Sequence, residues 1–257
     1  MSHNVSCRKN NKDKGEWWKM KIVKPMVIVP NKLTQYKLDN PDEVIDFLAN
    51  GARISYQSFE KKNGIETEER LIKNCIKNGH TSILEHESLT FDFITDRSIS
   101  LELCRHRIAS YVQESTRYVK YENGEMEFIR PIFSNTDMYD VWFQNCLDCE
   151  TAYIHMREAG AQPQEARAVL NNSFKTQIRM TRNFRAMREF LSLRCAKPAH
   201  PHIKEICIPL LLLMKQKFPV IFDDIKYDEE FLEKMDDWHT YIKEFVIPVK
   251  YLEEGEH

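Results

Sequence analysis

Apolar and polar residues alternate along this chain with two different periods, and these periods predict where strands and helices lie. Residues 20–30 are rich in β-branched side chains and predict a strand, with Pro25 marking an edge or a bulge. Residues 89–95 alternate apolar with polar side chains and predict a strand. Residues 174–181 alternate in the same way and predict a half-buried strand. A further short strand is predicted over residues 127–132.

A period of three to four residues marks the predicted helices, and several follow a residue that caps helices well. Asn40 precedes Pro41 at the start of one helix, Thr67 is expected to cap a second, and Asp96 or Ser98 a third. The helices predicted in this way cover residues 41–56, 67–77, 99–104, 136–160, 183–194 and 202–217, with a short one beginning at Pro163. Together the elements predict an α+β fold, a single domain with a small sheet flanked by long helices.

The first 19 residues show neither period. They are polar and basic before Trp17 and Trp18, which predicts a disordered or loosely attached arm over residues 1–19. No repeat or low-complexity segment interrupts the rest, so residues 20–257 are expected to form one domain. Because no apolar run reaches membrane-spanning length and no signal-peptide pattern is present, neither a membrane partner nor secretion is expected.

Composition narrows the class of function. The 257 residues carry a formal net charge of −2, so no overall basic field favours nucleic acid as a partner. With 7 glycines and neither a G-x-G-x-x-G nor a P-loop motif, Gly-rich nucleotide loops are not predicted. The 7 cysteines are odd in number and lack zinc spacing, which predicts thiols in a reducing cytoplasm and no metal site. Cys146 and Cys149 are expected to be core or surface thiols.

The most distinctive polar stretch covers residues 104–118 (C-R-H-R-I-A-S-Y-V-Q-E-S-T-R-Y). Arg105, His106 and Arg107 are consecutive, and a helix would fan them about 100° apart, so they reach in different directions. Guanidinium groups present planar donors that suit phosphates and carboxylates. The stretch therefore suits a large anionic ligand, whereas an isolated R-H-R is more often a solvated basic turn.

Other polar residues strengthen the case for a ligand. Between residues 80 and 86, two His, a Ser and a Glu gather in a predicted loop. Four more arginines lie within residues 104–118 or on segments beyond them: Arg117, Arg167, Arg185 and Arg194. Because grouped cations repel one another, a shared site requires a polyanionic ligand or acidic partners. Pairing with a local acid is the alternative for each, and it is favoured for Arg188, beside Glu189.

The spacing of the R-H-R stretch resembles the motif of the flavin-dependent thymidylate synthases. R-H-R is followed after seven residues by Ser115, and then by Arg117 and Tyr118. The resemblance extends through residues 78–86 (N-G-H-T-S-I-L-E-H), residues 165–170 (E-A-R-A-V-L) and the run from 182 to 223, and so covers roughly residues 20–225. It implies reductive methylation of dUMP to dTMP by a homotetramer, with FAD as cofactor and with methylenetetrahydrofolate and NADPH as co-substrates.

The resemblance also implies roles for individual residues. FAD would be held by His80, Ser82, Arg105, His106, Arg107, Gln113, Asn183 and Arg185. The dUMP pocket would be lined by Glu102, Arg105, Gln113, Glu114, Ser115, Thr116, Arg117, Arg167 and Arg194. Arg194 would be catalytic, facing the O2/N3 edge of the pyrimidine and stabilising charge that develops on the ring.

Some positions depart from the better-known pattern of the family: Glu102 and Glu114 stand where Gln and Leu are common, Glu189 replaces an amide and Pro198 a His. Two alternatives remain open: a pyrimidine-nucleotide hydroxymethylase on the same scaffold, and a nucleic-acid binder that uses Arg-rich loops. The near-neutral net charge argues against the second. A thymidylate synthase with a Cys nucleophile is disfavoured, because Cys104 precedes Arg, Cys195 precedes Ala, and the Pro-Cys-His elbow is missing.

Overall fold

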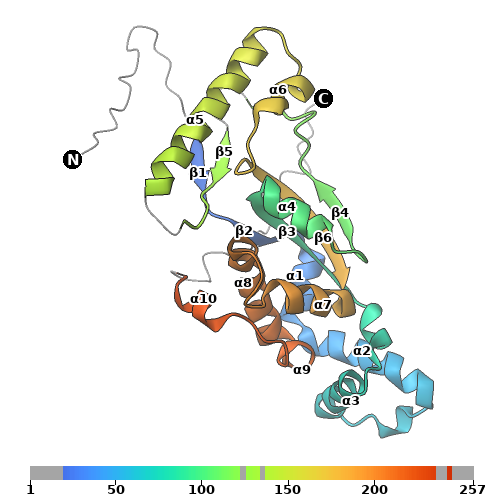
Figure 1. Ribbon diagram of the computed structural model, residues 1–257. Coiled ribbons are helices and arrows are strands. Elements are labelled where there is room, and N and C mark those ends of the chain that lie inside the picture. The colour runs from blue at the N-terminus through green and yellow to red at the C-terminus, as the bar shows by residue number, and fades with distance from the viewer. Residues whose placement is uncertain (1–19, 122–125, 134–136, 236–241, 245–257) are drawn as a thin grey trace, which may run out of the picture.

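The computed structural model describes residues 20–121, 126–133, 137–235 and 242–244 (Figure 1). Within these ranges the chain forms a five-stranded sheet in the order β4-β6-β3-β2-β7 and a two-stranded sheet of β1 and β5. The strands are β1 (Lys21–Val23), β2 (Met26–Val29), β3 (Ser88–Asp96), β4 (Ser110–Gln113), β5 (Glu127–Ile129), β6 (Lys175–Asn183) and β7 (Ile242–Glu244). The predicted arm over residues 1–19 lies outside the described residues.

Helices connect and cover these strands, which confirms the predicted α+β class. The α-helices are α1 (Lys32–Asp39), α2 (Pro41–Tyr56), α3 (Ile65–Lys77), α4 (Arg97–Cys104), α5 (Asp137–Glu158), α6 (Pro163–Ala166), α7 (Phe184–Arg194), α8 (Pro201–Lys217), α9 (Pro219–Phe222) and α10 (Glu229–Glu233). Short 3-10 turns are η2 (Phe59–Lys61), η3 (Thr81–Glu85) and η4 (Arg167–Val169). Among the described helices, none has the length and apolar character needed to cross a membrane.

The single strand predicted over residues 20–30 is wrong, because the segment divides between the two sheets. β1 pairs in parallel with β5, while β2 pairs antiparallel with β3. The division falls at Lys24 and Pro25, where proline lacks the N–H that a continuous ladder requires. The fold therefore contains two sheets where the sequence predicted one.

Two helix starts also differ from the prediction. Helix α3 begins at Ile65 after Gly64, whose φ of 77° suits glycine, and the predicted cap Thr67 instead donates to the carbonyl of Asn63 at 2.9 Å. Helix α1 was not predicted, although Asn31 caps it by accepting a hydrogen bond from the Thr34 N–H at 2.8 Å. Helix α2 begins at Pro41 as predicted, but the Asn40 side chain does not cap it and donates to the Tyr36 carbonyl of α1 at 2.8 Å. Asp96 is the residue that caps α4.

The main hydrophobic core lies between the five-stranded sheet and helices α2, α7 and α8 (Figure 1). The central pair is β3 with β6, which runs in antiparallel register from Ser88 opposite Asn183 to Asp96 opposite Lys175. A second cluster packs α5 against β5 and the residues that precede β6, and it includes buried Cys146, Cys149 and Tyr153. Cys146 and Cys149 are thus core thiols, as predicted.

Strand β6 shows the alternation that its sequence predicts, with one addition. Thr176, Ile178 and Met180 are buried, and every second residue between them is more exposed. Arg182 continues the buried series with 3% of its surface exposed. The strand therefore carries a cation into the interior at the point where it leads into α7.

Candidate functional site

Helix α4 gives the R-H-R stretch a rigid base. Asp96 caps the helix by accepting a hydrogen bond from the Ile99 N–H at 2.8 Å, and Ile99 and Leu103 are fully buried. After Cys104 the chain turns through residues 105–109 and enters β4, which pairs with β6. This turn contains Ile108 at a φ of 60°, an unusual conformation for a β-branched residue.

Two side chains from neighbouring strands hold this turn in place. The Tyr111 hydroxyl lies 2.7 Å from the carbonyl oxygens of both Leu103 and His106, so its proton is shared between them. The Arg182 Nη2 group donates to the Arg107 carbonyl at 2.8 Å. Neither Tyr111 nor Arg182 was among the predicted site residues.

Arg194, Glu102 and His106 form the most closely connected group in the region. Arg194 donates from Nε to His106 Nε2 at 2.7 Å and from Nη1 to Glu102 Oε2 at 2.5 Å. A longer bond of 3.3 Å joins Nη2 to the Glu102 carbonyl. The predicted catalytic residue is therefore held by the residues that precede and form the R-H-R turn, and Glu102 has Arg194 as its partner.

His106 is held in its neutral form. Burial lowers the pKa of its imidazole to about 4, and the positive charges of Arg194 and Arg182 act in the same direction. Because Nε2 accepts from Arg194, the hydrogen-bond network assigns the proton of the neutral ring to Nδ1. The ring also meets Phe190 edge-on, with centroids 4.9 Å apart.

Arg194 keeps donors that the described residues do not use. A guanidinium has five N–H groups, and the three bonds to His106 and Glu102 occupy one on Nε, one on Nη1 and one on Nη2. One N–H on each Nη therefore remains for a ligand. Helix α7 positions this group rigidly, because Phe190 and Leu191 on the same helix are fully buried.

Gln113 at the end of β4 and Glu114 after it form hydrogen bonds with neighbouring elements of the fold. Gln113 donates to Ser100 Oγ at 2.9 Å and to Thr176 Oγ1 at 3.2 Å. Glu114 accepts hydrogen bonds from the Tyr121 hydroxyl at 2.7 Å and from the Gln177 N–H at 3.1 Å. These partners fix the segment that also carries Ser115, buried Thr116 and Arg117.

Arg117 brings a distant segment to this region. Its Nε donates to Gln164 of α6 at 3.1 Å, and Arg167 follows at the start of η4 (Figure 1). Arg105, Arg107, Arg117 and Arg167 are all exposed, and none forms an ion pair within the described residues. The described chain therefore supplies no acidic partner for any of these four cations.

A second group of predicted residues lies where η3 meets the start of α7. Asn183 caps α7 by accepting from the Ala186 N–H at 2.8 Å, and Arg185 forms an exposed ion pair with Glu85 at 2.5 Å. His80 and Ser82 are exposed in the same loop. Since α7 has 11 residues and is ~16 Å long, this group and Arg194 lie at opposite ends of one helix.

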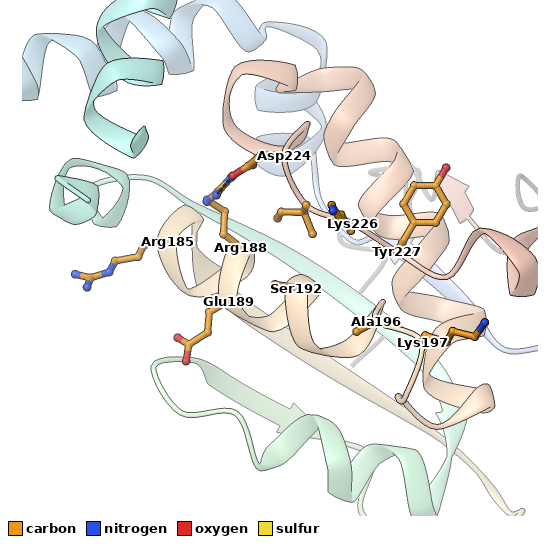
Figure 2. Close-up of a pocket in the computed structure, with 10 residues that line it drawn as sticks. Arg185, Arg188, Glu189, Ser192, Ala196, Lys197, Asp224, Lys226 and Tyr227 are labelled. Atoms are coloured by element: carbon orange, nitrogen blue, oxygen red, sulfur yellow. Dashed lines mark hydrogen bonds and ion pairs between the residues drawn. The ribbon is translucent and has the colours of Figure 1, made fainter. Parts of the chain in front are cut away.

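A cleft of about 680 Å³ opens between α7 and residues 224–227 (Figure 2). Arg188 crosses it to form a two-pronged pair with Asp224, each bond 2.7 Å long. Arg188 pairs with an acid, but the predicted local partner Glu189 is wrong: the partner is Asp224, 36 positions away, while Glu189 points away from Asp224 (Figure 2). The cleft lies on the face of α7 that carries Arg185 and Ser192, and Arg194 is not among its lining residues.

Arg182 could have been identified from the sequence. It continues the series of every second residue, Thr176, Ile178 and Met180, that faces the interior. An inward-facing cation beside a predicted ligand loop is a recognisable signal. Tyr111 gave no comparable signal, since β4 is defined by its pairing with β6 and by little in its own pattern.

Comparison with known proteins identifies the family. The family model described as thymidylate synthase complementing protein matches residues 32–220. The flavin-dependent thymidylate synthase of Geobacter sulfurreducens is 37% identical over 149 residues, which are 57% of this chain and 64% of the relative. The enzyme of that name from Corynebacterium efficiens is 32% identical over 196 residues, 68% of this chain and 77% of the relative.

Solved structures agree with these matches. Thymidylate Synthase X from Helicobacter pylori, crystallised with FAD and dUMP, superposes with a TM-score of 0.61 at 25% identity and covers 70% of this chain and 93% of its own. The UMP/dUMP methylase PolB from Streptomyces cacaoi shares the fold, with a TM-score of 0.64 at 21% identity over 79% of this chain and 96% of its own.

The matched stretch covers slightly less than two thirds of the Geobacter relative, so the likeness concerns the shared core of these proteins. That core contains α4, the R-H-R turn, β6 and α7, which together build the group around Arg194. Because the family model spans most of the described residues, the chain belongs to the thymidylate synthase complementing protein family.

Proposed function

We propose that the chain catalyses the flavin-dependent reductive methylation of dUMP to dTMP, with methylenetetrahydrofolate as carbon donor and NADPH as reductant. The observation that carries the proposal is that Arg105 and Arg107, which are exposed and have no acidic partner among the described residues, flank His106 in the sequence, and that His106 binds Arg194. Grouped guanidinium groups are favourable when phosphates neutralise them. The Helicobacter relative, crystallised with FAD and dUMP, supplies ligands of this kind.

The described residues fit FAD as a bound group. Arg105 and Arg107 are exposed on the turn and available for the pyrophosphate, and the Asn183 and Arg185 group lies at the other end of α7. His80, Ser82, His106 and Gln113 complete the set that we assign to FAD. When bound, FAD supplies the hydride chemistry, while the protein supplies position and electrostatic field.

The two unused N–H groups of Arg194 suit the O2/N3 edge of a pyrimidine. Negative charge develops on this edge when the ring is reduced, and a fixed guanidinium stabilises it more than it stabilises the neutral ring. Glu102 and His106 hold the guanidinium in place, so little reorganisation is required at the moment of reaction. Arg117 and Arg167 are assigned to the nucleotide phosphate, with Gln113, Glu114, Ser115 and Thr116 shaping the pocket.

No cysteine acts as nucleophile in this proposal. Burial raises the pKa of the Cys104 thiol and raises that of the Cys195 thiol well above its ordinary value, so both stay protonated. We assign the chain to a reducing cytoplasm because its 7 cysteines lack the spacing of a disulfide framework.

A second candidate is a related enzyme that leaves a different one-carbon group on the pyrimidine. The carboxylate of Glu102, where the better-known pattern has an amide, pairs with Arg194 and changes the charge at the end of the pocket. Mass analysis of the nucleotide product separates the two candidates, because methylation and hydroxymethylation differ by one oxygen atom.

The first test is the visible spectrum of the purified full-length chain, which should show bound oxidised flavin. Anaerobic addition of NADPH should bleach it, and dUMP with methylenetetrahydrofolate should then yield dTMP by mass spectrometry. A colourless protein that gains no absorbance or fluorescence quenching on titration with FAD would contradict the proposal.

A further inference from the structure

Arg182 is a buried cation without an acidic partner among the described residues. Only 3% of its surface is exposed, and its Nε and Nη1 atoms have no hydrogen-bond partner. Within the described part of the chain, its side chain makes one hydrogen bond, the 2.8 Å contact from Nη2 to the Arg107 carbonyl. Burial lowers the pKa of the guanidinium, which shows that the fold holds the charge at a cost.

The buried charge of Arg182 lies next to the R-H-R turn. The guanidinium carbon lies 5.2 Å from the centre of the Phe190 ring, and the same ring meets His106 edge-on. The Arg107 carbonyl that Arg182 binds directly precedes Ile108, which has a φ of 60°. A non-glycine residue in this conformation is strained, so the turn requires outside contacts to keep its shape.

We propose that Arg182 is a positioning residue for this site: it fixes the R-H-R turn through the Arg107 carbonyl and, with Arg194, flanks the His106 imidazole. The inference rests on the proposed function only for the identity of the ligand, FAD. It assigns Arg182 no contact with substrate or cofactor, because its side chain is buried.

The two arginines complement each other electrostatically. Arg194 approaches His106 from α7 and Arg182 from the end of β6, and the charges of both oppose protonation of the ring. The other polar groups around it are Glu102, which is paired with Arg194, the Tyr111 hydroxyl, and the exposed neighbours Arg105 and Arg107. A neutral ring accepts a hydrogen bond at Nε2, and a protonated ring would repel Arg194.

The test compares Arg182→Met, which removes charge and donor, with Arg182→Lys, which keeps the charge without the planar fork. His106 is titrated by NMR in flavin-free full-length protein, its signal being assigned through His106→Gln. FAD affinity is measured by fluorescence quenching. The matched control is Arg70→Met, because Arg70 is exposed on α3 and binds only the Glu66 carbonyl.

In Arg182→Met the pKa of His106 should rise by about one pH unit, and FAD affinity should fall about tenfold or more through the loosened turn. Arg182→Lys should keep the low pKa of His106 but lose FAD affinity severalfold, since an ammonium group cannot lie flat on Phe190 while binding the Arg107 carbonyl. Arg70→Met should change neither quantity.

Folded Arg182→Met with wild-type FAD affinity and wild-type titration of His106 would overturn the proposal. If Arg182→Met does not fold, Arg182→Lys decides, because wild-type FAD affinity in that variant would contradict the role at the turn. If the wild-type chain binds no FAD, the proposed function fails, whereas the titration of His106 in any folded variant still tests the role of Arg182.

Discussion

Replacing Arg194 with alanine tests the chemistry most directly. The change removes the guanidinium that bonds to Glu102 and His106 and, in the proposed function, the two free N–H groups that face the pyrimidine. The helix should persist, because α7 is anchored by Phe190 and Leu191, which are fully buried, and Arg194 is its last residue. The Glu102 side chain is 30% exposed, so water can solvate the carboxylate that is left behind.

The expected loss follows from the donors that Arg194 contributes. Removing one fixed donor to a developing anion typically costs about 10²- to 10³-fold in turnover. Arg194 offers two such N–H groups, but the paired Glu102 carboxylate partly offsets its charge. We therefore expect turnover to fall by roughly 10²-fold or more in Arg194→Ala. Arg194→Lys should recover only part of this, because a point charge cannot replace a two-pronged contact.

Three measurements separate the steps. Flavin occupancy is read from absorbance, dUMP affinity from calorimetry, and the chemical step from single-turnover oxidation of reduced flavin with dUMP and methylenetetrahydrofolate. Occupancy in Arg194→Ala should stay close to that of the wild type, because the proposed flavin contacts use other residues. Arg70→Met again serves as the control for loss of a surface arginine.

Two results would refute the reasoning. One is normal single-turnover oxidation in Arg194→Ala, which would mean that the guanidinium does not stabilise the transition state. The other is an activity loss that disappears when excess FAD restores occupancy, which would make Arg194 a cofactor-binding residue.

Three further predictions follow from the structure and the proposed function. Cys104→Ala and Cys195→Ala should keep turnover within about tenfold, and a loss of several orders of magnitude with flavin bound would contradict the absence of a cysteine nucleophile. Burial raises the pKa of Glu205 from 4.5 to about 7, although His202, Lys24 and Arg130 oppose the rise. The contribution of Glu205 to stability is therefore present below pH 4.5 and is lost as the pH rises to 7. Glu205→Gln should then increase the free energy of unfolding in urea by at most about 3 kcal/mol at pH 8 and by much less at pH 4.5; equal changes at the two pH values would be inconsistent with this. The FAD site should form between subunits of a homotetramer, and light scattering that shows a fully flavin-loaded monomer would exclude this.

Local signals predicted much of the framework. The Asn40-Pro41 start of α2 and the alternation of β6 each depend on a few neighbouring residues. The sequence also predicted β3 as a strand, although the structure buries every residue from Phe91 to Asp96 and so shows no alternation there. Strand β4 and the split at Pro25 depend on which distant segment supplies the partner, and period alone cannot determine this. The α+β class therefore followed from the pattern, and the number of sheets did not.

The site divides in the same way. The importance of the R-H-R stretch came from its spacing, but the sequence did not reveal that Glu102 binds Arg194, since the two residues are 92 positions apart. It also did not reveal that Gln113 and Glu114 bond to Ser100, Thr176 and Tyr121 of the scaffold. Their expected contacts with ligands stay predictions.

The division of the first strand between two sheets has a consequence for how the chain folds. β1 must find β5 and β2 must find β3, and both pairings close long loops, which is slow because chain entropy opposes them. Only Lys24 and Pro25 separate the two strands, so whichever pairing forms first brings the other strand close to its own partner. The second pair of strands then has only a short loop left to close. The cluster around α5 and the main core should therefore assemble in one cooperative transition.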